Sequence, residues 1–288
     1  MKPETKAQLE TLGVSFSGTT GADVHFGFGA TRSLLLEAPC QLRPGKFDVD
    51  RIGAYTYLGG GATVFRHMAT IGRFCSIASN IITGQVEHPP YFLSAHPMFQ
   101  GGWETTWPEI NGFYQDNADT IQKSSSTYLD EQQNRFGKIR VGNDVWIGEG
   151  VFLRRGIKIG DGAIIASRSV VVSDVPPFSI FGGIPAKLIR LRFDVEIVVE
   201  LKRLRWWDYG LSALAGVDFT DIEQAVQRID DNIRTGRAEP MIPRLVRVHA
   251  DGSVTRESET GETVPMANTS PPTPTMADNI ARLPEKAL

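Results

Sequence analysis

The sequence predicts an all-β solenoid, a parallel β-helix that carries one long insertion and is followed by α-helices. Three observations predict it. Aliphatic residues recur at every sixth position over residues 141–171, and glycine directly follows three of them. A second block over residues 52–77 keeps the same period with one slip. Between the two blocks, residues 84–138 lack the repeat and break the pattern.

The downstream block decides the fold class. Its repeat positions are Val141, Ile147, Leu153, Ile159, Ile165 and Val171. A period of six differs from the 3.6 residues of an α-helix and from the two residues of a simple strand. It suits a coil with flat sides joined by turns, in which one aliphatic side chain per side points inward. Stacked coils then share an aliphatic core, as in other solenoids.

The upstream block follows the same rule up to Val64 and resumes it at Ile71. The slip predicts a bulge or a longer turn between residues 66 and 70. Residues 24–49 are rich in Gly, Phe and Leu and are expected to form less regular early coils. We therefore place the β-helix at residues 24–193, after a polar N-terminal extension over residues 1–23.

After residue 193 the pattern turns helical. Asp194 is a plausible helix start, and Thr220 or Asp221 is a second. We expect the helices of residues 194–249 to pack against the open end of the β-helix and cover its unpaired edge. Residues 250–288 have few large apolar side chains and many Ser, Thr and Pro, which predicts a disordered tail.

The composition bounds the partners and the compartment. A net charge of -3 argues against non-specific binding to nucleic acid or to a membrane surface. No stretch approaches the roughly 18 apolar residues of a membrane span, and the opening "MKPETKAQLETLG" has no apolar signal core. Cys40 and Cys75 fit no metal spacing and are expected to be buried free thiols. These features predict a cytoplasmic protein.

Three segments sharpen the prediction to a family. They are "NDVWIG" at 143–148, "SVVVSDVPPFSIFGGIPAKLIRLRF" at 169–193 and "LKRLRWWDYG" at 201–210. They resemble the hexapeptide-repeat acyltransferases, and the last one resembles the xenobiotic acetyltransferase branch. That branch includes streptogramin and chloramphenicol acetyltransferases and polysaccharide O-acetyltransferase relatives. The resemblance spans roughly residues 50–235. It implies a left-handed parallel β-helix and a homotrimer with active sites between subunits.

The start of the insertion reads "GQVEHPPYFLSAHPMF" at residues 84–99. It is similar to the family pattern H-P-x-x-x-x-S-x-x-P-F, whose first histidine is the catalytic base. The resemblance therefore assigns His88 as the base, with Met98 standing where the family usually has Phe. Histidine suits the role because the ordinary pKa of imidazole is close to working pH. In the family the acceptor attacks acetyl-CoA directly, without a covalent intermediate on the enzyme.

The resemblance also implies a binding site for acetyl-CoA as co-substrate and no metal. It places Trp146 near the base and the cofactor arm. Ala166 and Ser167 lie in the coil that contacts the pantetheine arm through backbone groups, although "IIASRS" stands where I-G-A-G-S is frequent. Arg168 could reach a CoA phosphate or simply be solvated. Lys187, in "GIPAK", resembles the family lysine near the adenine and the 3′-phosphate.

Candidates for the acceptor site are less well defined. His96 could help bind the acceptor, or it could pack where the insertion returns. Trp103 belongs to the aromatic run "GGWETTWPEINGFYQ", which could fill a small core of its own or stack on a sugar ring or an antibiotic. Tyr55 and Tyr57 precede the catalytic loop by about two coils and could face the acceptor groove.

The leading functional hypothesis is an acetyl-CoA-dependent O-acetyltransferase acting on a hydroxyl of a sugar or polysaccharide precursor. The long insertion and the helical end favour this acceptor over an antibiotic or other xenobiotic of the chloramphenicol or streptogramin type, which is the alternative. A hypothesis of another class is a non-catalytic β-helix scaffold. A zinc lyase similar to the γ-class carbonic anhydrases is disfavoured because His88 and His96 lack a suitable third ligand.

Overall fold

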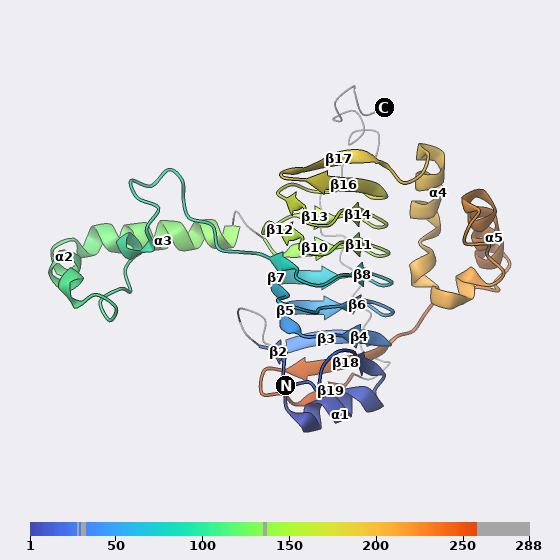
Figure 1. Cartoon of the computed structure of the whole chain (residues 1–288), viewed down its shortest axis with the longest axis horizontal. Helices are drawn as coiled ribbons and strands as arrows, with labels where there is room; N and C mark the ends of the chain where they lie inside the picture. The colour runs from blue at the N-terminus through green and yellow to red at the C-terminus, as the bar shows by residue number, and fades with distance from the viewer. Residues whose placement is uncertain (28, 30–32, 135–136, 258–288) are drawn as a thin grey trace.

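The computed structural model describes residues 1–27, 29, 33–134 and 137–257. Its centre is a tall stack of short strands, with an arm projecting from one side and helices lying along the other (Figure 1). The downstream strands are β10 (Ile139–Val141), β11 (Trp146–Ile147), β12 (Phe152–Leu153), β13 (Lys158–Ile159), β14 (Ile164–Ile165) and β15 (Val170–Val171).

The six-residue repeat gives stacked parallel strands. β10 pairs with β13, β11 with β14 and β12 with β15, all in parallel. Ile147 lies opposite Ile165, three repeats later in the chain. One coil therefore contains three strands and returns to its starting face one layer higher. Every repeat position from Val141 to Val171 is buried, with at most 2% of its surface exposed, so the inward aliphatic core is confirmed.

The upstream strands continue the stack to its N-terminal end. They are β1 (Val14–Phe16), β2 (Val24–Phe26), β3 (Ser33–Ala38), β4 (Cys40–Leu42), β5 (Gly45–Ile52), β6 (Tyr57–Leu58), β7 (Val64–Ile71), β8 (Ser76–Ile77) and β9 (Ile82–Thr83). The predicted slip is a bulge in β7. Phe65 pairs with Phe47 and Met68 with Val49, so two residues of β7 stand opposite one of β5.

The N-terminal residues are part of the stack, so the prediction of an extension over residues 1–23 is corrected. Residues Pro3–Thr11 form helix α1, and β1 pairs in parallel with β4. Leu9 and Val14 are buried in the same core as the coils. A strand of three residues is too short to show a periodicity, which explains why the sequence pattern missed it.

The end of the described chain also returns to the stack. β18 (Arg244–His249) pairs antiparallel with β3 and with β19 (Val254–Arg256). Residues 244–257 therefore differ from the predicted helical segment and tail, because Val246 and Val248 bury themselves against the first coils. The rest of the predicted tail, 258–288, lies outside the described residues.

The C-terminal end of the stack is closed by β16 (Ser179–Gly183), parallel to β14, and β17 (Ala186–Leu191), antiparallel to β16. Then follow α4 (Val195–Leu204), η3 (Trp206–Asp208), η4 (Gly210–Leu214) and α5 (Ile222–Arg234). These helices run along the side of the stack, so the expectation that they cover its end is wrong (Figure 1). The reason is that Phe74 and Phe178, on the sides of coils, pack into the helical cluster around Trp207.

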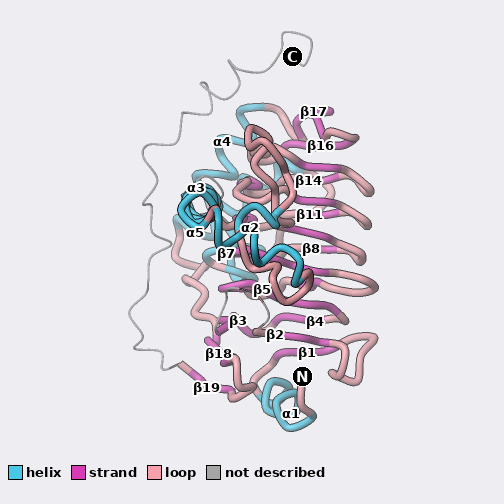
Figure 2. Tube along the Cα trace, turned by 90° about the vertical axis from the view of Figure 1, so that its left-hand side faces the viewer, coloured by secondary structure: helices cyan, strands magenta, loops and turns pink. Residues whose placement is uncertain are grey.

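The insertion forms the arm, defined here as residues 84–138. It contains η1 (Pro97–Gln100), η2 (Pro108–Ile110), α2 (Asn111–Asp116) and α3 (Ala118–Asn134). The arm leaves the stack after β9 and returns at β10, and its helices stand well away from the strands (Figure 1). Figure 2 looks at the arm from its end, so that α2 and α3 lie in front of the stack. Among the helices of the described chain, none combines the length and the apolar character that crossing a membrane requires.

Candidate active site

His88 lies at the root of the arm, where the chain has just left β9. Its side chain is exposed and borders a cavity of about 330 Å³. The other residues that line this cavity are Glu87, Pro89, Pro90, Glu131, Gln132 and Arg154. The cavity therefore joins three parts of the molecule: the loop after β9, the last turn of α3, and the turn that follows β12.

The residue next to His88 is fixed from two directions. The guanidinium of Arg154 donates two hydrogen bonds to the Glu87 carboxylate, from Nε to Oε1 at 2.6 Å and from Nη2 to Oε2 at 2.9 Å. Gln132 of α3 donates through Nε2 to the main-chain carbonyl of Glu87 at 2.9 Å. The hydrogen bond to Glu87 raises the pKa of Arg154, so the guanidinium keeps its charge. The loop that carries His88 is thus tied to both coil and arm.

Glu87, Gln132 and Arg154 are functional candidates that the sequence analysis missed. Glu87 is adjacent to His88, but its partners lie far along the chain and nothing in the repeat marks them. The one available signal was Arg154 itself, a cation directly after the repeat position Leu153. The contact between Glu87 and Arg154 can be recognised only in the folded structure, where the coil brings the two residues together.

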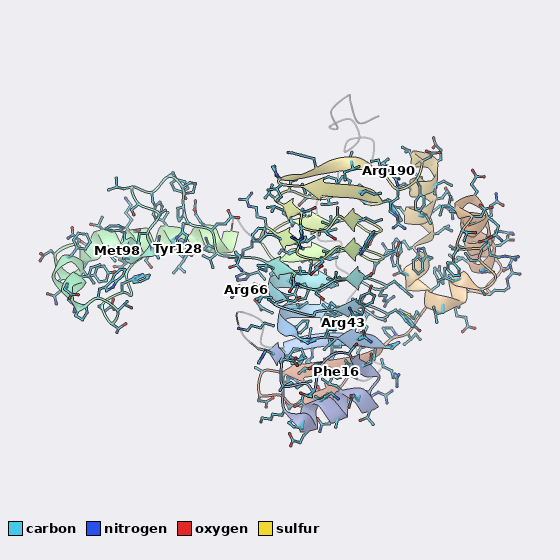
Figure 3. All side chains as sticks on the ribbon, viewed as in Figure 1. Phe16, Arg43, Arg66, Met98, Tyr128 and Arg190 are labelled. Atoms are coloured by element: carbon cyan, nitrogen blue, oxygen red, sulfur yellow. The ribbon has the colours of Figure 1, made fainter. Side chains whose placement is uncertain are left out.

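Trp146 lies on a different face of the stack. Its indole is 51% exposed on β11, opposite Ser76 on one side and Ile164 on the other. Tyr57 belongs to the same outward column, since it lies opposite Ser76 and its hydroxyl hydrogen-bonds Ser76 Oγ. The guanidinium of Arg43, labelled in Figure 3, lies 4.5 Å from the centre of the Tyr57 ring. The structure therefore brings Tyr57 and Trp146 to one surface.

The predicted pantetheine-binding residues lie at the corner that follows this face. The main-chain N–H of Arg168 donates to the carbonyl of Glu149 at 2.7 Å, one coil below. A Cβ on Gly148 would come within 2.6 Å of the main-chain nitrogen of Ser167. The coils approach so closely here that a side chain at position 148 has no room. The Ser167 and Arg168 side chains consequently point outward and are exposed.

Lys187 joins this corner from the closing hairpin. It lies opposite Gly182 in the antiparallel pair of β16 and β17, and its side chain is exposed. A Cβ on Gly182 would lie 3.2 Å from the Cβ of Ala166. The structure thus places all five predicted cofactor residues on neighbouring coils: Trp146, Ala166, Ser167, Arg168 and Lys187.

The remaining candidates lie elsewhere. Tyr55 stacks on Phe74 with ring centres 4.8 Å apart, and Phe74 in turn contacts Trp206 beside the C-terminal helices. Tyr55 is therefore separated from the Trp146 column. None of the five cofactor candidates of the same chain lines the His88 cavity. β9, which precedes His88, and β11, which carries Trp146, belong to different sheets.

His96 lies far out on the arm with two tryptophans. Its ring is 5.3 Å from Trp103 and 5.7 Å from Trp107, and the two indoles stack at 4.8 Å. His96 Nδ1 accepts a hydrogen bond from the main-chain N–H of Met98 at 3.1 Å and so caps η1. No cluster of three or more His, Cys, Asp or Glu side chains suited to a metal ion occurs in the described part of the chain.

Comparison with known proteins agrees with the repeat. The family model for the bacterial transferase hexapeptide (six repeats) matches residues 138–173. A chloramphenicol acetyltransferase of Morganella morganii is 40% identical over 147 residues, which are 50% of this chain and 61% of that protein. A probable macrolide acetyltransferase of Lysinibacillus sphaericus is 38% identical over 144 residues, which are 49% of this chain and 69% of that protein.

The match thus spans less than two thirds of the chloramphenicol acetyltransferase. Galactoside O-acetyltransferase of Escherichia coli (strain K12) is 42% identical over 52 residues, 18% of this chain and 26% of that protein. Among solved structures, a galactoside acetyltransferase in complex with coenzyme A aligns with a TM-score of 0.31 at 21% identity, over 67% of this chain and 82% of that chain.

Proposed function

The chain belongs to the hexapeptide-repeat acetyltransferase family, in its xenobiotic branch, and on that premise we propose that it is an acetyl-CoA-dependent O-acetyltransferase with His88 as general base. The observation that carries the proposal is the loop of Glu87 and His88 at the root of the arm, which hydrogen bonds hold in place. An exposed imidazole borders a cavity while the residue before it is held by Arg154 and Gln132. A base held in place loses little freedom when the acceptor binds.

In the proposed reaction the His88 imidazole accepts the proton of the acceptor hydroxyl as its oxygen attacks the thioester carbonyl. The new bond joins this oxygen to the acetyl carbon, the carbon–sulfur bond breaks, and the proton passes on to the leaving CoA sulfur. General base catalysis of this kind contributes about 10²- to 10⁴-fold. No group of the enzyme is acylated.

The residues gathered at the last coils fit the co-substrate. Ser167, Arg168 and Lys187 are exposed beside the Trp146 indole. Among the residues that the structure describes, no carboxylate forms an ion pair with Arg168 or Lys187, which leaves both cations available for the phosphates of CoA. Acetyl-CoA supplies the acetyl group, and these side chains would orient its two ends.

We further propose a left-handed winding of the coils and a homotrimer. The separation of His88 from Trp146 supports an active site that a second copy completes, since in one chain His88 follows β9 and Trp146 lies on β11, which belongs to the other sheet. Apolar side chains such as Ile184, 76% exposed, and Ile189, 59% exposed, stand near the cofactor corner and would be covered by a neighbour. The buried free thiols Cys40 and Cys75 support a reducing, cytoplasmic location.

The proposed acceptor is a hydroxyl of a sugar or polysaccharide precursor. The stacked indoles of Trp103 and Trp107 support it, because flat apolar rings suit the face of a sugar. The second candidate is a chloramphenicol- or macrolide-like alcohol. It is favoured by the names of the relatives that share about half of this chain.

The test is release of the CoA thiol from acetyl-CoA, with the wild type and His88→Ala, against sugars, nucleotide sugars, chloramphenicol and a macrolide. We expect turnover with at least one acceptor and a loss of about 10²- to 10⁴-fold in His88→Ala. His249→Ala is the matched control, because His249 hydrogen-bonds Thr255 on the terminal hairpin. Full activity of a folded His88→Ala protein would disprove the base assignment. The acceptor that turns over decides between the two candidates.

A further inference from the structure

A second and larger groove, of about 750 Å³, lies on the face formed by β5, β7, β10 and β13. None of the candidate active-site residues lines it. The groove is also lined by Arg205, which directly precedes η3, and by Asp208 of η3. The groove is therefore distinct from the His88 cavity and from the corner that carries Arg168 and Lys187.

One edge of this groove is formed by the main chain of glycine residues, which carry no side chains. Gly53, Gly72, Gly142 and Gly160 follow one another up the stack. A Cβ on Gly53 or on Gly160 would meet the backbone of the next coil at 2.5 Å. Side chains are therefore excluded along this edge. The chemistry of the groove is decided by the charged side chains on either side.

The charges in the groove are unequal in number. It is lined by five cations and three carboxylates: Arg51, Arg73, Arg140, Lys158 and Arg205, with Glu37, Asp161 and Asp208. Each carboxylate already has a partner. The buried Glu37 pairs with Arg51 and, at 2.6 Å, with Arg73; Asp208 pairs with Arg205 at 2.7 Å. Asp161 accepts hydrogen bonds from the main chain and side chain of Asn143.

The pKa of Glu37 reflects the strength of its two ion pairs. Burial alone would raise the pKa of this carboxyl, but the hydrogen bonds and charges of Arg73 and Arg51 outweigh it and lower the pKa below its usual range. Glu37 is therefore ionised at neutral pH and committed to these two arginines. It is not available to neutralise other cations of the groove.

Arg140 and Lys158 are the two cations of the groove that pair with none of these carboxylates. They lie directly opposite each other in the parallel pair of β10 and β13, on strands about 4.8 Å apart. Both point outward, since their neighbours Val141 and Ile159 are buried. Within the described residues neither side chain has an ion pair. Like charges placed directly across a pair of strands destabilise each other, and an anion between them removes that cost.

We propose that this groove binds a ligand through a diphosphate group held between Arg140 and Lys158. A guanidinium grips two phosphate oxygens at once, and an ammonium neutralises a neighbouring phosphate as a point charge. A diphosphate matches two cations on adjacent strands better than a single phosphate does. The chemistry is shared by free pyrophosphate and by nucleotide sugars. The site is separate from the acetyl donor site and does not depend on the proposed transfer reaction.

The experiment is a calorimetric titration of the full chain with inorganic pyrophosphate at low salt, repeated with Arg140→Gln and Lys158→Gln. We expect wild-type binding that weakens with added salt, and a loss of about tenfold for each substitution. Lys202→Gln is the matched control, because Lys202 is exposed on α4 outside the groove. It should bind within about twofold of the wild type.

Parallel titrations identify the source of the diphosphate. UDP-glucose binding more tightly than pyrophosphate, with the same loss in the two variants, assigns a nucleotide sugar; equal binding assigns free pyrophosphate. Absence of pyrophosphate binding by the wild type, or equal losses in Lys202→Gln, would overturn the proposal. A parallel loss of acetyl-CoA binding in Arg140→Gln and Lys158→Gln would overturn it as well, because the groove would then belong to the donor site.

Discussion

The coil stack and the arm are built on opposite rules. In the stack, the aliphatic residue at every sixth position is buried, and each coil repeats the contacts of the coil below. Among the described residues of the arm, Ile110 is the one large aliphatic or aromatic side chain that is buried, and Leu93 is fully exposed. The stack therefore has its stability distributed over equivalent layers. The arm keeps its apolar surface at the outside, where it is available for contact with another molecule.

The largest expected difference between the two regions comes from truncating one aliphatic side chain in each. Ile147→Ala removes a fully buried side chain and should lower the free energy of unfolding by about 2–5 kcal/mol. Leu93→Ala should change it by less than about 0.5 kcal/mol. Urea unfolding followed by circular dichroism measures both. Equal losses would mean that the arm is packed against the stack in solution.

Matched glycines sharpen the comparison. A Cβ on Gly72 would collide with the carbonyl of Gly142 in the next coil, whereas a Cβ on Gly112 in α2 meets nothing within 4 Å. Gly72→Ala should therefore cost about 1–3 kcal/mol of unfolding free energy. Gly112→Ala should add about 0.5–1 kcal/mol, since alanine favours the helix. The same urea titration decides the sign of each change, and a neutral Gly72→Ala would contradict the close approach of the coils.

The same contrast explains what the sequence could predict. The stack was predictable because each repeat position, such as Ile147, meets an equivalent residue and the pattern repeats without interruption. The bulge in β7 left its mark as a slip of one residue. The ends of the stack were missed because they do not repeat. β18 showed only the alternation "RLVRVH", and its partner β3 lies about two hundred residues earlier.

The candidate site was predictable only in part. A histidine in the segment where the repeat stops drew attention to His88, and resemblance assigned its role. The Glu87–Arg154 contact joins residues 67 positions apart, and no local rule relates them. Lys158 and Arg140 each look like an ordinary exposed cation in the sequence. Their pairing across β10 and β13 follows from coil closure, which depends on the whole stack.

A smaller effect is expected from Arg154, where the two regions meet. Arg154→Met frees the loop that carries His88 and should lower kcat about tenfold, or about 1.4 kcal/mol in activation free energy. The KM for acetyl-CoA should stay unchanged, because Arg154 lines the His88 cavity, which contains none of the proposed donor residues of the same chain. Arg154→Lys should restore part of kcat by keeping one ion pair. The control is Arg234→Met, an exposed arginine paired with Asp231. An unchanged kcat would show that the pair does not position His88.

The smallest effect at neutral pH is expected for the two thiols, which belong to the stack. Burial raises the pKa of Cys40 and of Cys75 to about 12, from an ordinary value of 9.0. Below pH 9 the folded and unfolded chains both keep these protons, so stability does not depend on them. Between about pH 9 and 12 the unfolded chain releases them and the folded chain does not. Stability should therefore fall as pH rises through this window.

Thiol labelling tests this prediction and compares the accessibility of a thiol in the stack with that of a thiol in the arm. With a disulfide reagent at pH 8, the native wild type should remain unlabelled, whereas Gln122→Cys, exposed on α3, should react at once with one equivalent. Unfolding in urea should expose both native thiols. At pH 10 the alkaline loss of stability should be smaller in Cys40→Ala/Cys75→Ala than in the wild type. Rapid labelling of Cys75 in the native protein would contradict its burial, and would show that the coils open locally while the stack remains folded.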